Sequence, residues 1–165
     1  MGCAMDKLDL HILRLLQSNA RAANAEIARK IGLAPSATLE RIRKLEQRGL
    51  IRGYEARLDS AALGLGLVAF VFVRSKERAG AVKTGQRLAA IPEVQEVHHI
   101  AGEDCFLVKV RAANTEALGR LLRKRFGAFP QITSTRTTIV LETLKETASL
   151  PVPRDAQRKP GNGHA

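Results

Sequence analysis

Two short amphipathic segments joined by a glycine turn constrain this chain more than any other feature. They lie within residues 24–53, and Gly32 separates them. Gly32 suits the left-handed conformation in which a helix often ends, and Pro35 suits the first turn of the next helix. The apolar residues that share a helical face are Ile27, Ala28 and Ile31 in the first segment and Leu39, Ile42 and Leu45 in the second. The pattern predicts a helix-turn-helix whose second helix spans residues 35–48.

The outer face of the second helix is polar and mostly cationic. Such a face fits either a solvated surface or a DNA major groove, and the preceding helix and turn favour DNA. Arg21, which precedes the first helix of the helix-turn-helix, fits either a phosphate contact or a plain surface charge. The residues expected to read bases are Ser36, Thr38, Glu40 and Arg41, and those expected to hold phosphates are Arg21, Arg43 and Lys44.

A supporting helix and a short ribbon are expected on either side of this motif. Residues 6–17 predict an amphipathic helix that Asp6 can cap. Residues 50–58 alternate in polarity and predict a short strand or β-ribbon, so the domain over residues 5–58 is winged-helix-like. Arg52 and Arg57 of the ribbon are either solvent-exposed or in contact with the DNA backbone.

Charge and cysteine content indicate the kind of partner and the cellular compartment to expect. The 165-residue chain has a formal net charge of +11, which favours a polyanionic partner such as nucleic acid. The two cysteines, Cys3 and Cys105, lack metal-ligand spacing and fit reduced thiols. The chain has neither an apolar run long enough to span a membrane nor a secretory signal, so we expect a cytoplasmic protein.

The pattern changes after a small-residue linker over residues 59–66. Alternating and β-branched runs predict strands over residues 67–73, 94–101, 106–110 and 133–144, with helices over residues 78–91 and 115–126. This βαββαβ order predicts a ferredoxin-like domain over residues 67–147 and an α+β protein overall. Helices cover one face of such a sheet, and we expect the bare face to form a homodimer. Residues 148–165 are rich in Pro and Gly and predict a disordered tail.

No catalytic constellation is evident. His98 and His99 are adjacent on a predicted strand, so they point to opposite faces and cannot share a metal ion. An enzyme or an amino-acid carrier is a rival reading, but the chain lacks a nucleophile–base pair, and we expect no cofactor. The turn over residues 101–105 combines a glycine with two acids, which fits either an ammonium-binding site or a plain acidic hairpin.

The chain as a whole resembles the Lrp/AsnC (leucine-responsive/asparagine, or feast/famine) family of transcriptional regulators. The resemblance covers nearly everything from residue 5 to residue 147. It rests on the segments LDLHILRLLQSNAR, AEIARKIGLAPSATLERIRKLEQRGLIRGYEARLD, GEDCFLVKV and TSTRTTIVLETLKE.

The resemblance implies a sequence-specific regulator that binds double-stranded DNA through residues 35–48. Members of the family form homodimers that often assemble into octamers, and small effectors, commonly amino acids, bind between dimers near the hairpin. The residues that this similarity assigns to the effector pocket are His99, Gly102, Glu103, Asp104, Cys105, Thr133 and Thr135.

Two departures from the family pattern bear on these expectations. Cys105 and Phe106 stand where the family often has an aspartate followed by an aromatic residue, so a ligand-independent, architectural DNA-binding protein of the same fold is the alternative. Ala23 and Ala34 stand where the family favours a capping Ser or Thr, and Asn24 is the expected substitute at the first site.

Overall fold

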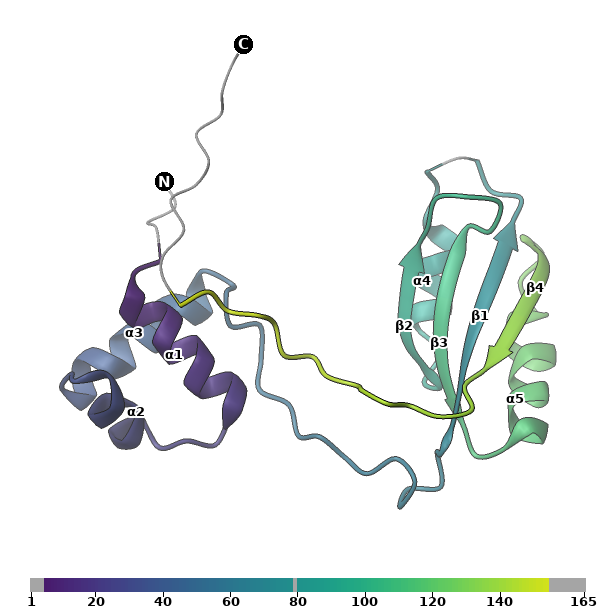
Figure 1. Ribbon diagram of the computed structural model, residues 1–165. Helices are drawn as coiled ribbons and strands as arrows, with labels where there is room; N and C mark the ends of the chain where they lie inside the picture. The colour runs from purple at the N-terminus through teal and green to yellow at the C-terminus, as the bar shows by residue number, and fades with distance from the viewer. Residues whose placement is uncertain (1–4, 79, 155–165) are drawn as a thin grey trace, which may run out of the picture. The chain divides into compact units, whose positions relative to one another are not determined.

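The computed structural model describes residues 5–78 and 80–154, which divide into two units (Figure 1). One unit contains the chain up to Arg57 together with the segment from Thr147 onward, and the other runs from Leu58 to Glu146. The chain therefore passes between the units twice. Within the described ranges, no helix is both long and apolar enough to cross a membrane.

The first unit contains three helices: α1 (Lys7–Ser18), α2 (Asn24–Ile31) and α3 (Pro35–Gln47). The predicted helix-turn-helix and its supporting helix are thus confirmed. Asp6 caps α1, because its carboxylate accepts a 2.8 Å hydrogen bond from the Asp9 backbone N–H. Gly32 ends α2 in the left-handed conformation, with φ at 72°.

The face of α3 that packs inward differs from the prediction. Leu39 was expected in the core, but it is 39% exposed, whereas Thr38 is fully buried with Ile42 and Leu45. Helical spacing allows either position 38 or position 39 to share a face with positions 42 and 45. The Thr38 hydroxyl donates a 3.1 Å hydrogen bond to the Ala34 carbonyl, so its burial leaves no unpaired polar group. The buried apolar core of this unit comprises Ile12, Ile27, Ile31, Ile42 and Leu45.

The predicted ribbon over residues 50–58 is wrong, because this segment contains no strand. Gly49, with φ at 69°, closes α3, and the Leu50 N–H donates to the Leu45 carbonyl at 2.9 Å. Ile51 then packs against the helical core. Among the described residues of this unit there is no strand for the segment to pair with, and alternation without a partner forms no ladder.

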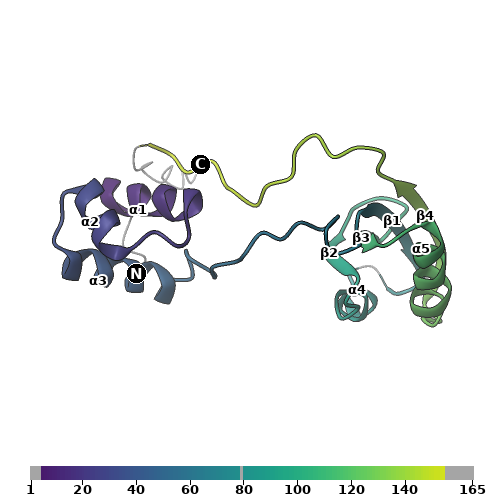
Figure 2. The same cartoon turned by 90° about the horizontal axis from the view of Figure 1, so that it is seen from below.

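The second unit has the predicted βαββαβ order. Its elements are β1 (Leu67–Ser75), α4 (Lys83–Ala89), β2 (Val94–His99), β3 (Phe106–Ala112), α5 (Thr115–Leu121), the π-helical turn η1 (Leu122–Phe126) and β4 (Ile132–Ile139). The four strands are antiparallel in the order β2-β3-β1-β4. Both helices lie on one face of the sheet (Figures 1 and 2).

Two element boundaries differ from the predictions by more than two residues, and one helix ends in a different helical type. The helix expected over residues 78–91 begins only at Lys83, and residue 79 lies outside the described ranges. The last strand ends at Ile139 rather than at residue 144, because its antiparallel partner β1 begins only at Leu67 and the ladder runs out there. The helix over residues 115–126 is continuous, but its last turn is π-helical.

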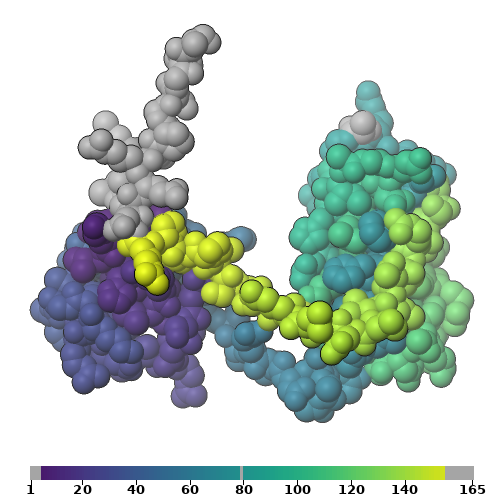
Figure 3. All heavy atoms as spheres, viewed as in Figure 1, coloured from purple at the N-terminus to yellow at the C-terminus, as the bar shows by residue number. Residues whose placement is uncertain are grey.

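The two faces of the sheet differ in chemistry. Ala69, Val71 and Val73 of β1 point towards the helices and are fully buried. Phe70 and Phe72 point the other way and are only half-buried. No helix of the described residues covers that second face, and Figure 3 shows strand atoms of this unit at the surface.

Residues 148–154, part of the segment expected to be disordered, are extended and hydrogen-bonded to α1. The Gln17 side-chain amide donates to the Leu150 carbonyl at 2.9 Å and accepts from the Leu150 N–H at 2.7 Å. Arg14 donates to the Pro153 carbonyl at 2.6 Å. A side-chain amide carries both a donor and an acceptor, so it can satisfy both backbone groups of one residue. Residues 155–165 of the expected tail, like Cys3, lie outside the described ranges.

We expect Gly85→Ala to lower the free energy of unfolding by about 1–3 kcal/mol. A Cβ atom at residue 85 would lie 2.6 Å from Cε1 of Phe106, which is 1% exposed and has little room to move. Urea unfolding followed by circular dichroism measures the loss. Gly53→Ala is the control, because a Cβ there meets nothing within 4 Å. Equal unfolding midpoints for the two variants would show that the Phe106 ring yields freely.

Candidate functional site

The exposed face of α3 carries polar and charged side chains. Ser36, Glu40, Arg43 and Lys44 are all exposed, as is Arg21 before α2. Glu40 and Lys44 form an ion pair at 2.6 Å, and the hydrogen bond from Lys44 lowers the pKa of Glu40. Arg43 pairs with no residue in the described ranges, so its guanidinium is available to an external anion.

The starts of α2 and α3 lie close together and lack side-chain caps. Ala23 and Ala34 occupy the cap positions, and neither helix start has a capping hydrogen bond from a side chain. The expectation that Asn24 caps α2 is wrong, because its amide donates instead to the Pro35 carbonyl at 2.7 Å. The first N–H groups of α3 therefore have no side-chain acceptor, which suits contact with a phosphate.

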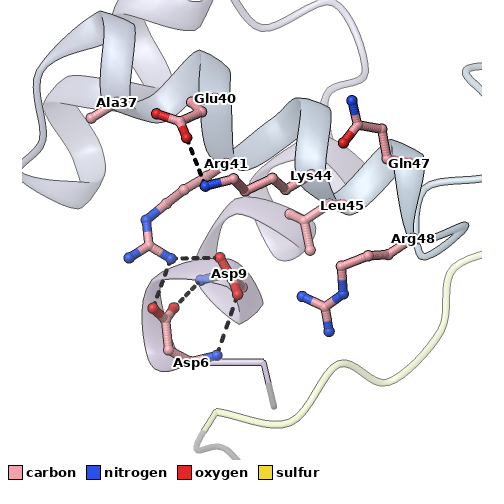
Figure 4. Close-up of a pocket in the computed structure, with 9 residues that line it drawn as sticks. All are labelled: Asp6, Asp9, Ala37, Glu40, Arg41, Lys44, Leu45, Gln47 and Arg48. Carbon is pink, nitrogen blue, oxygen red and sulfur yellow. Dashed lines mark hydrogen bonds and ion pairs between the residues drawn. The ribbon is translucent and has the colours of Figure 1, made fainter. Parts of the chain in front are cut away.

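Two of the predicted DNA contacts point inward. Thr38 is buried, so its hydroxyl cannot reach a base edge, and that prediction is wrong. The Arg41 Nη1 atom lies 2.7 Å from carboxylate oxygens of both Asp6 and Asp9, so its guanidinium faces α1 (Figure 4). Hydrogen bonds to Asp9 and Asp6 raise the pKa of Arg41 above its usual value. The assignment of Arg41 to base reading is not supported by this geometry, which gives the side chain a positioning role.

A hollow of about 430 Å³ separates the start of α1 from α3. Figure 4 shows Arg41 extending to Asp6 and Asp9 on one side of it, and the Glu40–Lys44 pair on another side of α3. The residues around it are Asp6, Asp9, Ala37, Glu40, Arg41, Lys44, Leu45, Gln47 and Arg48. Helix α3 thus uses one polar side to hold α1 and leaves the other exposed.

The predicted effector hairpin joins β2 to β3, and its acids are already paired. Glu103 lies 2.7 Å from Arg74 of β1, and Asp104 lies 3.2 Å from Arg136 of β4. Arg74 Nε is also 4.0 Å from Asp104. Neither arginine is among the effector residues predicted from the sequence. Arg74 lies two residues after Phe72 in β1, and Arg136 is opposite Phe72 in β4, so both share its face, away from the helices. The two-residue spacing in β1 is the signal that could have placed Arg74 there.

The remaining predicted effector residues do not all gather with these charges. His99 is opposite Phe106, and Thr135 is opposite Val73, so both belong to the helix-covered face, whereas Arg136 is opposite Phe72 on the other face.

The residues at the turn itself lie nearer to the charged group. The Thr133 hydroxyl donates to the Arg74 carbonyl at 3.2 Å, and the Cys105 Sγ lies 3.4 Å from the Ser75 carbonyl. Gly102 adopts φ of 134°, which a residue with a side chain rarely does. The predicted site is therefore divided between two faces of the sheet end.

Arg74, Arg136, Glu103 and Asp104 form a charge group that matches both ends of an amino acid. A guanidinium binds a carboxylate through paired hydrogen bonds, and a carboxylate accepts from an ammonium. The four side chains come from β1, the hairpin and β4, so all three segments would respond to a bound ligand. A ligand would have to replace the internal ion pairs to bind here.

Both units of the chain match known protein domains. Residues 5–46 match the AsnC-type helix-turn-helix domain, and residues 68–150 match the Lrp/AsnC ligand binding domain. An HTH-type transcriptional regulator of Pyrococcus horikoshii is 39% identical over 153 residues, which cover 92% of this chain and 99% of the relative.

The chain is also similar to proteins of known structure. The feast or famine regulatory protein of Mycobacterium tuberculosis, complexed with L-methionine, aligns with a TM-score of 0.83 at 34% identity, covering 91% of this chain and all of that one. A transcriptional regulator of Neisseria meningitidis in complex with L-methionine aligns with a TM-score of 0.83 at 30% identity, covering 89% and 96% of the two chains.

We expect the stabilising effect of the Asp6 carboxylate to depend on pH. Burial raises the pKa of Asp6, but the Asp9 N–H and Arg41 more than offset it, so the net shift is downward. A carboxyl with a lowered folded-state pKa stabilises the fold above its unfolded pKa, and this effect is lost as the pH falls through the folded pKa. Asp6→Asn should therefore cost more free energy of unfolding at pH 7 than at pH 3, measured with urea.

The control for this measurement is Glu55→Gln, which alters an exposed carboxylate. Among described residues it has no ion-pair partner. A cost of Asp6→Asn that is the same at both pH values would contradict the role assigned to the Arg41 pair.

Proposed function

The chain belongs to the Lrp/AsnC family of transcriptional regulators, and we propose that it is a sequence-specific, dimer-based regulator responsive to an amino acid or related small effector. Family membership makes it a DNA-binding transcriptional regulator with a ligand-binding domain, and not an enzyme. The exposed polar face of α3 is the observation that carries the sequence-specific part of this proposal. We further propose that it acts in the cytoplasm of a bacterial or archaeal cell.

In this proposal, α3 enters the major groove with its exposed face. Ser36 and Glu40 meet base edges, while Arg43, Lys44 and Arg21 meet phosphates. The uncapped start of α3 adds backbone N–H groups that favour an anion. Two such helices in a dimer reach successive major grooves about one helical turn apart. Arg41 does not read bases but holds α3 against α1.

The uncovered sheet face supports the proposed dimer. Phe70 and Phe72 lie on it only half-buried. The chain beyond β4 also exposes apolar side chains, with Leu141 and Leu144 almost wholly in solvent. A second copy of the chain placed against this face would remove apolar surface from water, which stabilises association. Further assembly of dimers into an octamer is part of the same proposal.

The charge group at the hairpin supports the proposed effector site. An amino acid between Arg74 or Arg136 and the acids of the hairpin would exchange the internal ion pairs for ligand contacts. L-Methionine is the ligand named for two similar solved structures. An effector shifts assembly or DNA binding only if it binds one state more tightly than the other.

We expect Arg43→Ala to weaken binding to duplex DNA and to reduce the salt dependence of that binding. Losing one phosphate contact lowers the slope of log affinity against log salt by about 0.9. The measurement is fluorescence anisotropy with a duplex from upstream of this protein's own coding sequence and a random duplex. Lys83→Ala, which removes an exposed cation of the second unit, is the control. Parent-like binding of Arg43→Ala to both duplexes would contradict the phosphate contact assigned to Arg43.

We expect Asp104→Asn to raise the amino-acid concentration needed to change DNA binding by about tenfold or more, because a charge-assisted contact is lost. Titration with L-methionine and with a pool of the twenty amino acids measures this effect. Glu55→Gln, which alters an exposed acid outside the hairpin, is the control. An unchanged response in both Asp104→Asn and Arg74→Ala would place the effector elsewhere. A parent protein indifferent to the whole pool would favour the ligand-independent, architectural alternative.

A further inference from the structure

We propose that the second unit carries its own phosphate-binding surface, in a cation-rimmed hollow at α5 and η1, and that it binds the backbone of duplex DNA. This surface is separate from α3 and from the hairpin, since it lies at the end of β3 while the hairpin precedes the start of β3. The inference rests on the proposed function only in taking DNA as the partner.

The hollow has a volume of about 380 Å³ and a floor of small apolar residues. Ala112 and Leu121 are buried at its base, and Ala113 and Ala117 add little bulk. The side chains around it are Leu65, Glu93, Arg111, Ala112, Ala113, Ala117, Arg120, Leu121, Lys124 and Arg125. Four of these are cations and one is an acid, so the rim attracts anions.

Internal partners neutralise only half of the rim cations. Arg111 is held by Glu146 at 2.8 Å and by Gln95 at 2.9 Å. Arg120 pairs with Glu116 on the same helix. Lys124 and Arg125 are exposed, and neither forms an ion pair with any residue in the described ranges. These two cations are therefore free to meet external phosphates.

The local backbone explains why these cations point outward together. η1 is anchored by Leu121 before it and by Phe126 at its end, both of which are buried in the core. The intervening residues Arg123, Lys124 and Arg125 are all exposed. A π-helical turn is rare and places more residues in one turn than an α-helix does, so three consecutive cations fan out over one side. Such turns occur frequently at functional sites.

Duplex DNA fits this surface better than an acidic protein or a small anion does. The regulator's partner is DNA, whose backbone presents a continuous series of phosphates to successive cations. Backbone contacts carry no sequence information, so they need no side chains arranged for base edges. We therefore expect the surface to add affinity for cognate and random duplexes alike.

The test uses the full chain carrying Lys124→Ala and Arg125→Ala, with fluorescence anisotropy on cognate and random duplexes between 50 and 200 mM salt. Losing two phosphate contacts should lower the slope of log affinity against log salt by about 1.8 on both duplexes. The matched control carries Lys76→Ala and Lys83→Ala, which also remove two exposed cations from the second unit. Circular dichroism checks that both variants fold as the parent does.

Parent-like salt slopes in the Lys124/Arg125 variant would overturn the proposal, as would an equal loss in the Lys76/Lys83 control. A parent that binds inorganic phosphate or a free nucleotide here by calorimetry, while the variant keeps its full DNA slope, would also reject DNA as the occupant. The variant Arg43→Ala separates this inference from the proposed function. A loss of slope only in Arg43→Ala would reject this surface alone, whereas a loss only in the Lys124/Arg125 variant would reject the Arg43 phosphate contact and support this surface.

Discussion

The ion pairs of Arg41 with Asp6 and Asp9 determine how the DNA-facing helix is presented. The same two carboxylates close the start of α1 through a reciprocal capping arrangement, so one polar group both begins α1 and holds α3. Asp9 is nearly buried, which reduces solvent screening of its pair with Arg41. Arg41 is fixed on this side of α3, and Thr38 and Leu45 lie in the core. The remaining face of the helix, with Ser36, Glu40 and Arg43, is therefore exposed to solvent.

In the second unit, the alternation of side chains along the strands gives the two faces of the sheet different chemistry. One face of the sheet packs β-branched residues and Phe106 under α4 and α5. The other carries half-buried phenylalanines with basic side chains such as Lys109 and Arg136. The charge group at the hairpin stands at the end of this second face, beside the surface that we propose a partner subunit covers. A ligand at the hairpin could thus influence assembly through adjacent side chains rather than through a long-range path.

The sequence predicts the helices and the βαββαβ order of the second unit, because periodicity depends on residue type alone. It does not decide between Thr38 and Leu39 as the buried position of α3, since both are compatible with the spacing of Ile42 and Leu45. It also does not reveal that Arg41 is paired with Asp6, a contact between residues 35 positions apart. The ribbon over residues 50–58 fails for a related reason, because a strand requires a partner that local alternation cannot supply.

The double passage of the chain makes the second unit an insertion within the first. A protease that cuts once between residues 58 and 66 would leave the segment 148–154 attached to the larger fragment and docked on α1. Among the described residues, that attachment includes exposed hydrogen bonds of the Arg14 and Gln17 side chains with the backbone of Leu150 and Pro153, each contributing about 0.5–1.5 kcal/mol. Nicked protein would therefore come apart on dilution, and the intact linker is what keeps the DNA-binding helices and the ligand-binding sheet in one molecule.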